Sequence, residues 1–266
     1  MNAATSSPSL YAPPRLSARW FPVWQRNFLV WRKLALPSIL GNLADPLIYM
    51  LGLGYGLGSM LPEVAGTSYV AFLAAGTVCA STMNAATFEA LYSAFSRMHV
   101  QKTWEAMLNA PLELEDVMLG ELIWAATKSL LSGCAILTVI FVLGLSHSPL
   151  ALGVLPVILL TGLAFAALGL IVNALAPSYD FFMYYFTLFI TPTMLLSGVF
   201  FPREQLPVLV QGLTEALPLT HAVQLVRPLL QGQVPANALL HVAVLLAITA
   251  VAFLVALVLT RRRLLR

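Results

Sequence analysis

Six long apolar segments constrain the fold of this chain more than any other feature of its sequence. They cover residues 36–58, 69–95, 117–144, 150–175, 181–201 and 237–260. A helix needs about 20 apolar residues to cross the hydrocarbon core of a bilayer, and each segment approaches or exceeds that length. Because backbone groups inside lipid must be satisfied internally, such segments form helices. The sequence therefore predicts an all-α integral membrane protein with six transmembrane helices.

The composition excludes an ordinary soluble domain. Of the 266 residues, 59% are hydrophobic and 9% are charged, whereas a soluble domain carries about 25% charged residues. The net charge of +3 is small, so we attribute the basic residues to membrane topology and expect no nucleic-acid partner. Cys79 and Cys134 both lie in apolar segments and indicate neither a disulfide framework nor a metal site.

The distribution of Lys and Arg predicts the orientation. Eleven of the 14 lie before the first segment, between the second and third, or after the sixth. The opposite side has only Arg203 and Arg227, and Lys128 lies inside the third segment. The positive-inside rule then places both termini in the cytoplasm, and an even number of spans agrees.

The N-terminal region is predicted to divide into a flexible tail at 1–14 and an amphipathic helix at 15–34, ahead of a transmembrane domain at 35–266. One stripe of that helix is aromatic, and another is cationic (Trp24, Phe28 and Trp31; Arg19, Arg26 and Lys33). This pattern favours a helix lying in the headgroup layer. The alternative is a basic juxtamembrane segment with no fixed structure.

Two connections between membrane segments are predicted to carry helices, a cytoplasmic one and a longer one on the outer side. Residues 101–110 form a short cytoplasmic helix that stops at Pro111, on which Trp104, Met107 and Leu108 make an apolar knob. A soluble partner could grip that knob, or the helix could simply lie at the interface. On the outer side, 203–217 and 219–230 are amphipathic pieces bounded by Pro or Gly, which predicts a broken helical hairpin between spans five and six.

Two further groups of side chains could serve transport. Asp45 and Lys128 lie roughly 14 and 18 Å from the cytoplasmic ends of their helices, which makes them a possible ion pair. The alternative for Lys128 is snorkelling, helped by Glu121. An aromatic cluster could line a path for sugar or lipid, although packing is the ordinary role for any one of its members: Tyr179, Phe181, Tyr184, Tyr185 and Phe189.

We find no motif for catalysis or metal binding. The four histidines have no HExxH spacing, there is no GxSxG nucleophile, and no Lys follows the glycine of a Walker A loop. The glycine-rich LGLGYGLGS ends a membrane span and favours close helix packing over phosphate or ion binding.

From about Trp31 to Leu264 the chain resembles the membrane subunit of ABC exporters of the ABC-2 type. The resemblance is carried, in order, by ADPLIYMLGLGYGLG, SYVAFLAAG, TFEALYSAFSRM, KTWEAMLNAPL, LGELIWAATKS, LTGLAFA, ALAPSYD, ITPTMLLSGVFFPREQL, LPLTHAVQLVRP and RRRL. It implies a permease in the bacterial inner membrane that works as two copies with two ABC ATPase subunits. ATP and Mg would bind the ATPases, and this chain would carry no cofactor. The cargo implied is a lipo-oligosaccharide or another amphipathic, glycolipid-like molecule.

The resemblance also implies roles for particular residues. The coupling helix that docks on the ATPase would contain Lys102, Trp104, Glu105, Met107 and Leu108. A re-entrant outer gate would be formed by the 203–230 hairpin, with Phe200, Phe201, Pro202 and Leu206. Three alternatives stay open: an exporter of drugs or other lipids, an ion-coupled secondary transporter, and a membrane-bound transferase acting on lipid.

Overall fold

The computed structural model describes residues 14, 17–61, 63–64 and 66–264, without the side chains of Asn42 and Asp45. The predicted tail at 1–14 therefore lies almost wholly outside the described residues.

The first half of the chain forms a bent helical run made of α1 and α2, two further long membrane helices and the short helix between those two. Its elements are α1 Trp20–Trp31, α2 Ala35–Ile48, α3 Gly54–Gly56, β1 Glu63–Val64, β2 Thr67–Ser68, α4 Tyr69–Phe88, α5 Thr103–Leu108 and α6 Leu114–Val142. A 3₁₀ turn joins α1 to α2, and π-helical turns extend α2 through Leu53 and α4 through Val100. The strands β1 and β2 pair antiparallel as a two-residue hairpin.

The second half contains two long membrane helices, one shorter apolar helix and the short helices of the predicted outer hairpin. Its elements are α7 Val154–Leu175, α8 Phe181–Tyr185, α9 Thr191–Leu196, α10 Val208–Thr214, α11 Pro218–Leu230 and α12 Ala238–Leu264. A π-helical turn joins α8 to α9, and 3₁₀ turns precede α7 and α10.

In the part of the chain that the structure describes, five helical runs are long and apolar enough to cross a membrane: 20–56, 69–100, 114–142, 149–175 and 238–264. The expected fifth span, 181–201, is shorter than predicted, because its helix ends at Leu196. Gly198 then takes a left-handed backbone with φ +79°, which turns the chain out of the helix. At 1.5 Å per residue the run 181–196 reaches about 24 Å, less than a hydrocarbon core of about 30 Å.

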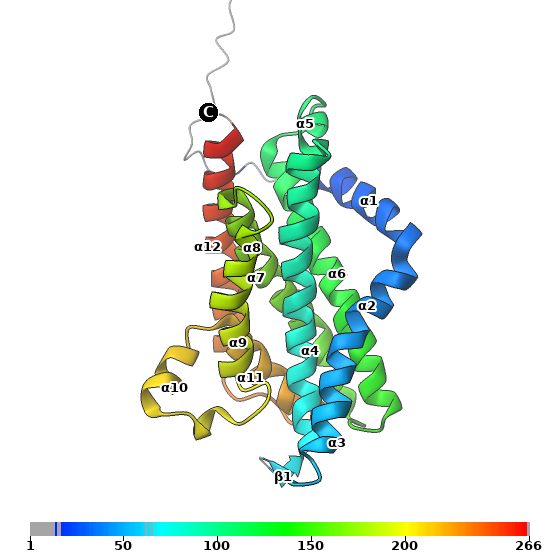
Figure 1. Cartoon of the computed structure of the whole chain (residues 1–266), viewed down its shortest axis with the longest axis vertical. Coiled ribbons are helices and arrows are strands. Elements are labelled where there is room, and N and C mark those ends of the chain that lie inside the picture. Colours follow the sequence, from blue (N-terminus) through cyan, green and yellow to red (C-terminus); the bar gives the residue numbers. More distant parts are fainter. Residues whose placement is uncertain (1–13, 15–16, 62, 65, 265–266) are drawn as a thin grey trace, which may run out of the picture.

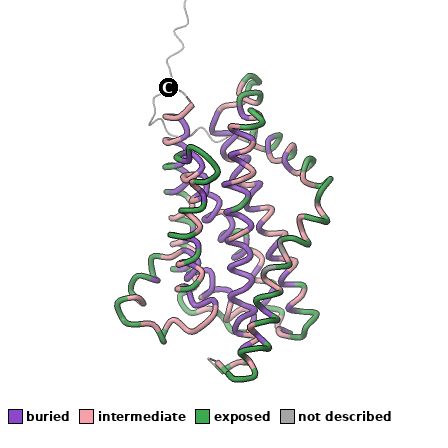
Figure 2. Tube along the Cα trace, viewed as in Figure 1, coloured by how far each residue is buried: buried purple, intermediate pink, exposed green. Residues whose placement is uncertain are grey.

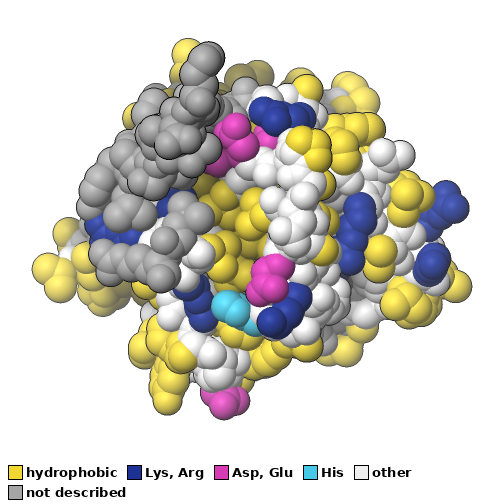
Figure 3. Space-filling model, turned by 90° about the horizontal axis from the view of Figure 1, so that it is seen from above, with side chains coloured by type: hydrophobic (Ala, Val, Ile, Leu, Met, Phe, Trp, Pro, Cys, Tyr) yellow, Lys and Arg dark blue, Asp and Glu magenta, His cyan; other side chains and the backbone are white. Residues whose placement is uncertain are grey.

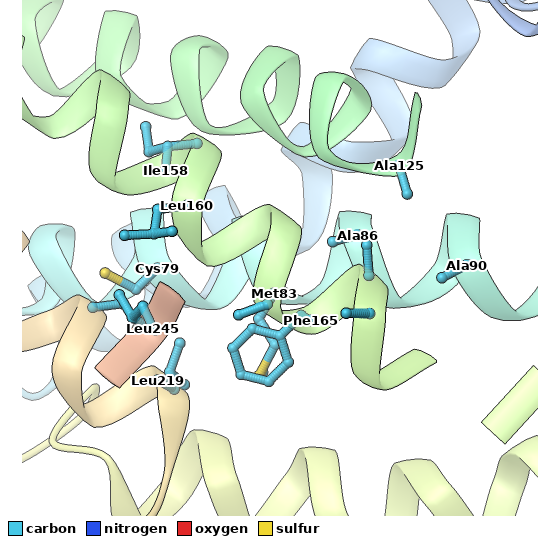
Figure 4. Close-up of a cluster of buried hydrophobic side chains, with 14 of the residues drawn as sticks. Cys79, Met83, Ala86, Ala90, Ala125, Ile158, Leu160, Phe165, Leu219 and Leu245 are labelled. Atoms are coloured by element: carbon cyan, nitrogen blue, oxygen red, sulfur yellow. The ribbon is translucent and has the colours of Figure 1, made fainter. Parts of the chain in front are cut away.

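The long helices lie side by side in an elongated bundle, with α5 at one end and α10 and β1 at the other (Figure 1). Burial is concentrated along α4, whose residues are buried on nearly every face (Figure 2). Met83 of α4, Phe165 of α7 and Leu245 of α12 meet in this core (Figure 4). Small residues bring the helices together, since a Cβ on Gly162 would lie only 1.9 Å from Ser129 Oγ of α6.

The predicted aromatic stripe of the N-terminal helix is confirmed. Trp24 stacks on Phe28 with ring centroids 5.5 Å apart, and Phe28 contacts Trp31. The stripe faces protein, because Trp24 Nε1 donates to Thr127 Oγ1 of α6 (3.0 Å) and Trp31 packs edge-on against Trp124. Helix α1 and helix α2 meet at a bend that stands away from the bundle (Figure 1).

Candidate functional site

A buried charge cluster joins α4 to α6 near the end of the bundle that carries α5. Arg97, expected in a cytoplasmic loop, instead lies on the helical extension of α4 and is 9% exposed. Its Nη2 lies 2.8 Å from Glu89 Oε1, and its Nε donates to Glu121 Oε1 at 2.9 Å. The expectation was wrong because Arg97 finds two carboxylates inside the bundle, and paired charges can be buried.

Three more side chains complete this cluster. Lys128 Nζ lies 2.7 Å from Glu89 Oε2, Trp124 Nε1 donates to Glu89 Oε1 (2.8 Å), and Trp104 Nε1 donates to Glu121 Oε1 (3.2 Å). We call Glu89, Arg97, Trp104, Glu121, Trp124 and Lys128 the charge cluster. Its two carboxylates balance its two cations, and its indoles occupy further carboxylate lone pairs.

The partner of Lys128 in the structure is Glu89. The side chain of Asp45 lies outside the described residues, so the ion pair between Asp45 and Lys128 stays a prediction. Depth in the membrane suggested that pair, but depth does not say which face of a helix a side chain occupies.

The short helix α5 turns its apolar knob inward. Trp104 is 2% exposed, and Met107 and Leu108 pack against the main core. The exposed side chains are Lys102, Glu105, Ala106 and Asn109. Lys and Arg side chains stand around this end of the molecule, with hydrophobic surface between them (Figure 3). If a partner docks here, it meets the polar face of α5, while Trp104 holds the helix to the bundle.

The predicted path aromatics do not form one surface. Tyr185 stacks on Phe189 at 5.2 Å, and Tyr179 packs against Tyr92 and Phe95 of the α4 helical run. Tyr184 is 64% exposed, and Phe181 is half-buried with its ring against Tyr184. These aromatic rings therefore lie in several separate contacts, and their part in a path stays a prediction.

A small cavity of about 110 Å³ opens between α2, α4 and the segment around α9. Its wall is part apolar and part polar: Pro46, Tyr49, Thr77, Ala80, Ser81, Asn84, Met194, Val199 and Phe200. Sequence reasoning identified only Phe200 among these. The missed signal was the polar run Ser81, Thr82 and Asn84 inside an apolar span, where such side chains need a partner or a function.

The predicted outer-gate segment is held from two sides. Tyr69 Oη donates to the Phe200 carbonyl (3.1 Å), and Arg227 Nη2 donates to the Gly198 carbonyl (2.6 Å). The Arg227 guanidinium also lies 3.7 Å from the centroid of the Phe72 ring, a cation–π contact. Phe201, Pro202 and Leu206 follow and are half-buried. Gating by these residues stays a prediction.

A histidine pair ties the outer hairpin to α12. His221 Nε2 lies 2.9 Å from the Glu215 carbonyl, so that nitrogen carries a proton. In a neutral ring His221 Nδ1 then accepts, and the donor is His241 Nδ1 at 2.8 Å. When the Gln224 amide is rotated so that its oxygen and nitrogen exchange places, its nitrogen donates to His241 Nε2 (2.8 Å) and its oxygen accepts from Arg203. With both histidine rings neutral, each N–H group in this series of contacts meets an acceptor.

Replacing His241 is therefore expected to loosen the predicted outer hairpin. His241→Leu leaves the His221 ring and the Gln224 amide without their partner on α12, and a buried polar group without a partner destabilises the contact around it. Hydrogen–deuterium exchange in 208–230 should rise severalfold over the wild type. The exposed His147→Ala should exchange like the wild type. Equal exchange of His241→Leu and the wild type would contradict this assignment.

Comparison with known proteins decides the family. Residues 19–230 match the family model described as ABC-2 type transporter. The chain belongs to this family. Within it, nodulation protein J of Rhizobium leguminosarum bv. viciae is 54% identical over 253 residues, which cover 95% of this chain and 98% of that protein. Nodulation protein J of Rhizobium meliloti (strain 1021) is 51% identical over 95% of this chain and 97% of its own length.

A more distant relative is the inner membrane transport permease YadH of Escherichia coli (strain K12). It is 24% identical over 210 residues, 78% of this chain and 79% of its own length. The resemblance inferred from the sequence motifs is thus confirmed, and the chain is an ABC-2 transporter permease with several membrane-spanning helices.

Proposed function

We propose that this permease is the membrane-spanning half of an ATP-driven exporter in a bacterial inner membrane. Two copies form the passage, and two ABC ATPase subunits at the cytoplasmic side bind and hydrolyse ATP with Mg. Both termini lie in the cytoplasm, because helix α1, which carries Arg26, and the arginine-bearing C-terminal end of α12 lie toward the end of the bundle that carries α5 (Figure 1).

One observation carries the coupling part of this proposal. Trp104 of α5 is buried and bonded to Glu121 of α6, and Glu121 is bonded to Arg97 of the α4 helical run. A push on the exposed face of α5 therefore reaches two membrane helices through packed and charged contacts. Such a connection lets an ATPase bias the bundle between two states, provided that it binds one state more tightly.

The cargo we propose is a lipo-oligosaccharide or another amphipathic molecule that carries both sugar and lipid. Relatives named nodulation protein J are similar over nearly the whole chain. The mixed wall of the cavity beside Tyr49, Asn84 and Phe200 is compatible with a molecule that has polar and apolar parts. Drugs and other lipids are the alternative cargo.

The test is export by purified components. The permease and its ATPase are reconstituted in vesicles, and ATP-dependent movement of a fluorescent lipo-oligosaccharide is measured. Ala106→Arg adds a bulky cation to the exposed face of α5, and we expect it to lower both ATPase binding and transport about tenfold, as steric and charge clashes at a docking surface do. Gln233→Arg makes a similar change on an exposed residue after α11 and should have no effect.

The outcomes separate the alternatives. Transport that needs the ATPase and is lost only in Ala106→Arg supports the proposal. Transport driven by an ion gradient without the ATPase would instead make the permease a secondary transporter, with Glu89 and Lys128 as candidate coupling groups. Unchanged ATPase binding by Ala106→Arg would refute α5 as the docking helix.

A further inference from the structure

A second cavity lies between α1, the helical extension of α4, and α6. Its volume is about 170 Å³. Polar and aromatic side chains from all three helices line it, among them Arg26, Asn27, Trp31, Arg97, Trp124 and Lys128. It adjoins the charge cluster and lies on the side of the bundle covered by the oblique helix α1, away from the cavity at Phe200. We call it the α1 cavity.

The described charged side chains around the α1 cavity are three cations and two carboxylates. Arg97 and Lys128 are balanced by Glu89 and Glu121. Arg26 donates to Asn27 Oδ1 (3.0 Å) and, at 3.5 Å, to Thr103 Oγ1, and both of these acceptors are neutral. Among the side chains that the structure describes, which exclude that of Asp45, no carboxylate lies within ion-pair distance of Arg26. The described side chains Arg26, Arg97, Lys128, Glu89 and Glu121 therefore carry a net charge of +1.

The same cavity has a buried donor that lacks an acceptor. Asn27 is 3% exposed, and its Nδ2 has no hydrogen-bond partner among the residues that the structure describes. A buried N–H without an acceptor is unfavourable, because it has given up its hydrogen bond to water without a replacement. An anionic ligand with oxygen atoms would accept a hydrogen bond from Asn27 Nδ2 and would balance the charge of the Arg26 guanidinium beside it.

From these observations we infer that the α1 cavity binds a phosphate group, held by the Arg26 guanidinium and the Asn27 amide. A guanidinium presents a planar fork of donors that suits phosphate oxygens. Basic pockets between membrane helices at the cytoplasmic side bind the headgroups of anionic lipids. Trp31 and Trp124 line the same cavity, and tryptophan favours the headgroup level of a bilayer. The phosphate of an anionic phospholipid in the adjoining leaflet is the source that this placement favours.

Binding is tested on the purified full chain in detergent micelles, without ATPase or cargo, so its result does not depend on the export proposal. The protein is titrated with phosphatidylglycerol, with phosphatidylcholine, and with sodium phosphate, and bound ligand is counted by native mass spectrometry. Arg26→Gln is expected to weaken phosphatidylglycerol binding about tenfold, as the loss of a charged hydrogen bond does. Arg32→Gln removes an exposed cation from the turn that follows α1 and should change binding less than about twofold.

A second variant distinguishes the loss of the binding site from misfolding of Arg26→Gln. Asn27→Asp places a carboxylate beside Arg26, cancels the extra charge and should weaken phosphatidylglycerol binding by a similar factor. Should sodium phosphate alone show the Arg26-dependent binding, the site takes phosphate from solution rather than from lipid. The inference is overturned if the binding of phosphatidylglycerol and of sodium phosphate is independent of Arg26 and Asn27. It is also overturned if Arg32→Gln weakens binding as much as Arg26→Gln, since that would mean general attraction to the basic surface.

Discussion

Replacing Arg97 with methionine is expected to lower the free energy of unfolding by about 3–5 kcal/mol, the cost of leaving a buried charge without its partner. Arg97 is the one cation that contacts both Glu89 and Glu121 in the charge cluster. Without it Glu89 retains Lys128, but Glu121 retains only the indole N–H of Trp104. The thermal midpoint in detergent should fall by about 6–20 °C.

A double variant separates lost charge balance from lost packing. Arg97→Met with Glu121→Gln also removes the orphaned carboxylate, and we expect it to recover more than half of the lost midpoint. Lys102→Met removes an exposed cation near the same end of the bundle and should leave the midpoint unchanged within about 2 °C. If Arg97→Met melts like the wild type, the charge cluster does not stabilise the bundle.

Replacing Trp104 with alanine is expected to release α5 from the bundle and to lower ATP-dependent transport by about tenfold or more. A buried Trp→Ala change costs about 3–5 kcal/mol in cavity and transfer terms. Helix α5 has only six residues, and a helix of that length is not stable without tertiary contacts. The ATPase would then press on a loose segment, and its movement would not reach α4 and α6.

Two matched variants make this prediction specific. Trp104→Phe keeps most of the buried ring and loses only the hydrogen bond to Glu121, so it should retain most transport. Trp124→Ala removes an equally buried indole from the same cluster without touching α5. Transport is measured in vesicles with equal amounts of folded permease. If Trp124→Ala and Trp104→Ala lose transport equally, the loss reflects stability of the bundle, and α5 has no special part in coupling.

The corrections to the sequence interpretation share one cause. Arg97 was assigned to a loop because an unpaired charge belongs in water, yet its partners stand eight and 24 positions away along the chain. The inward turn of Trp104 likewise depends on how helices are rotated against one another, and so does the contact of Lys128 with Glu89, which the sequence did not predict. Helical periodicity places residues on a common face but does not say which neighbour that face meets.

What the sequence determined by itself is the all-α membrane class, five of the six predicted membrane helices, the aromatic stripe of α1, the short helix between α4 and α6, and the family. These follow from local hydropathy, local spacing and motif order, which need no knowledge of distant contacts. Only the tertiary structure decided the charge cluster, the histidine pair, the anchoring of Gly198 by Arg227 and the short fifth helix. Each of these depends on where separate helices come together, because a polar or charged group can be buried only where a distant residue supplies its partner.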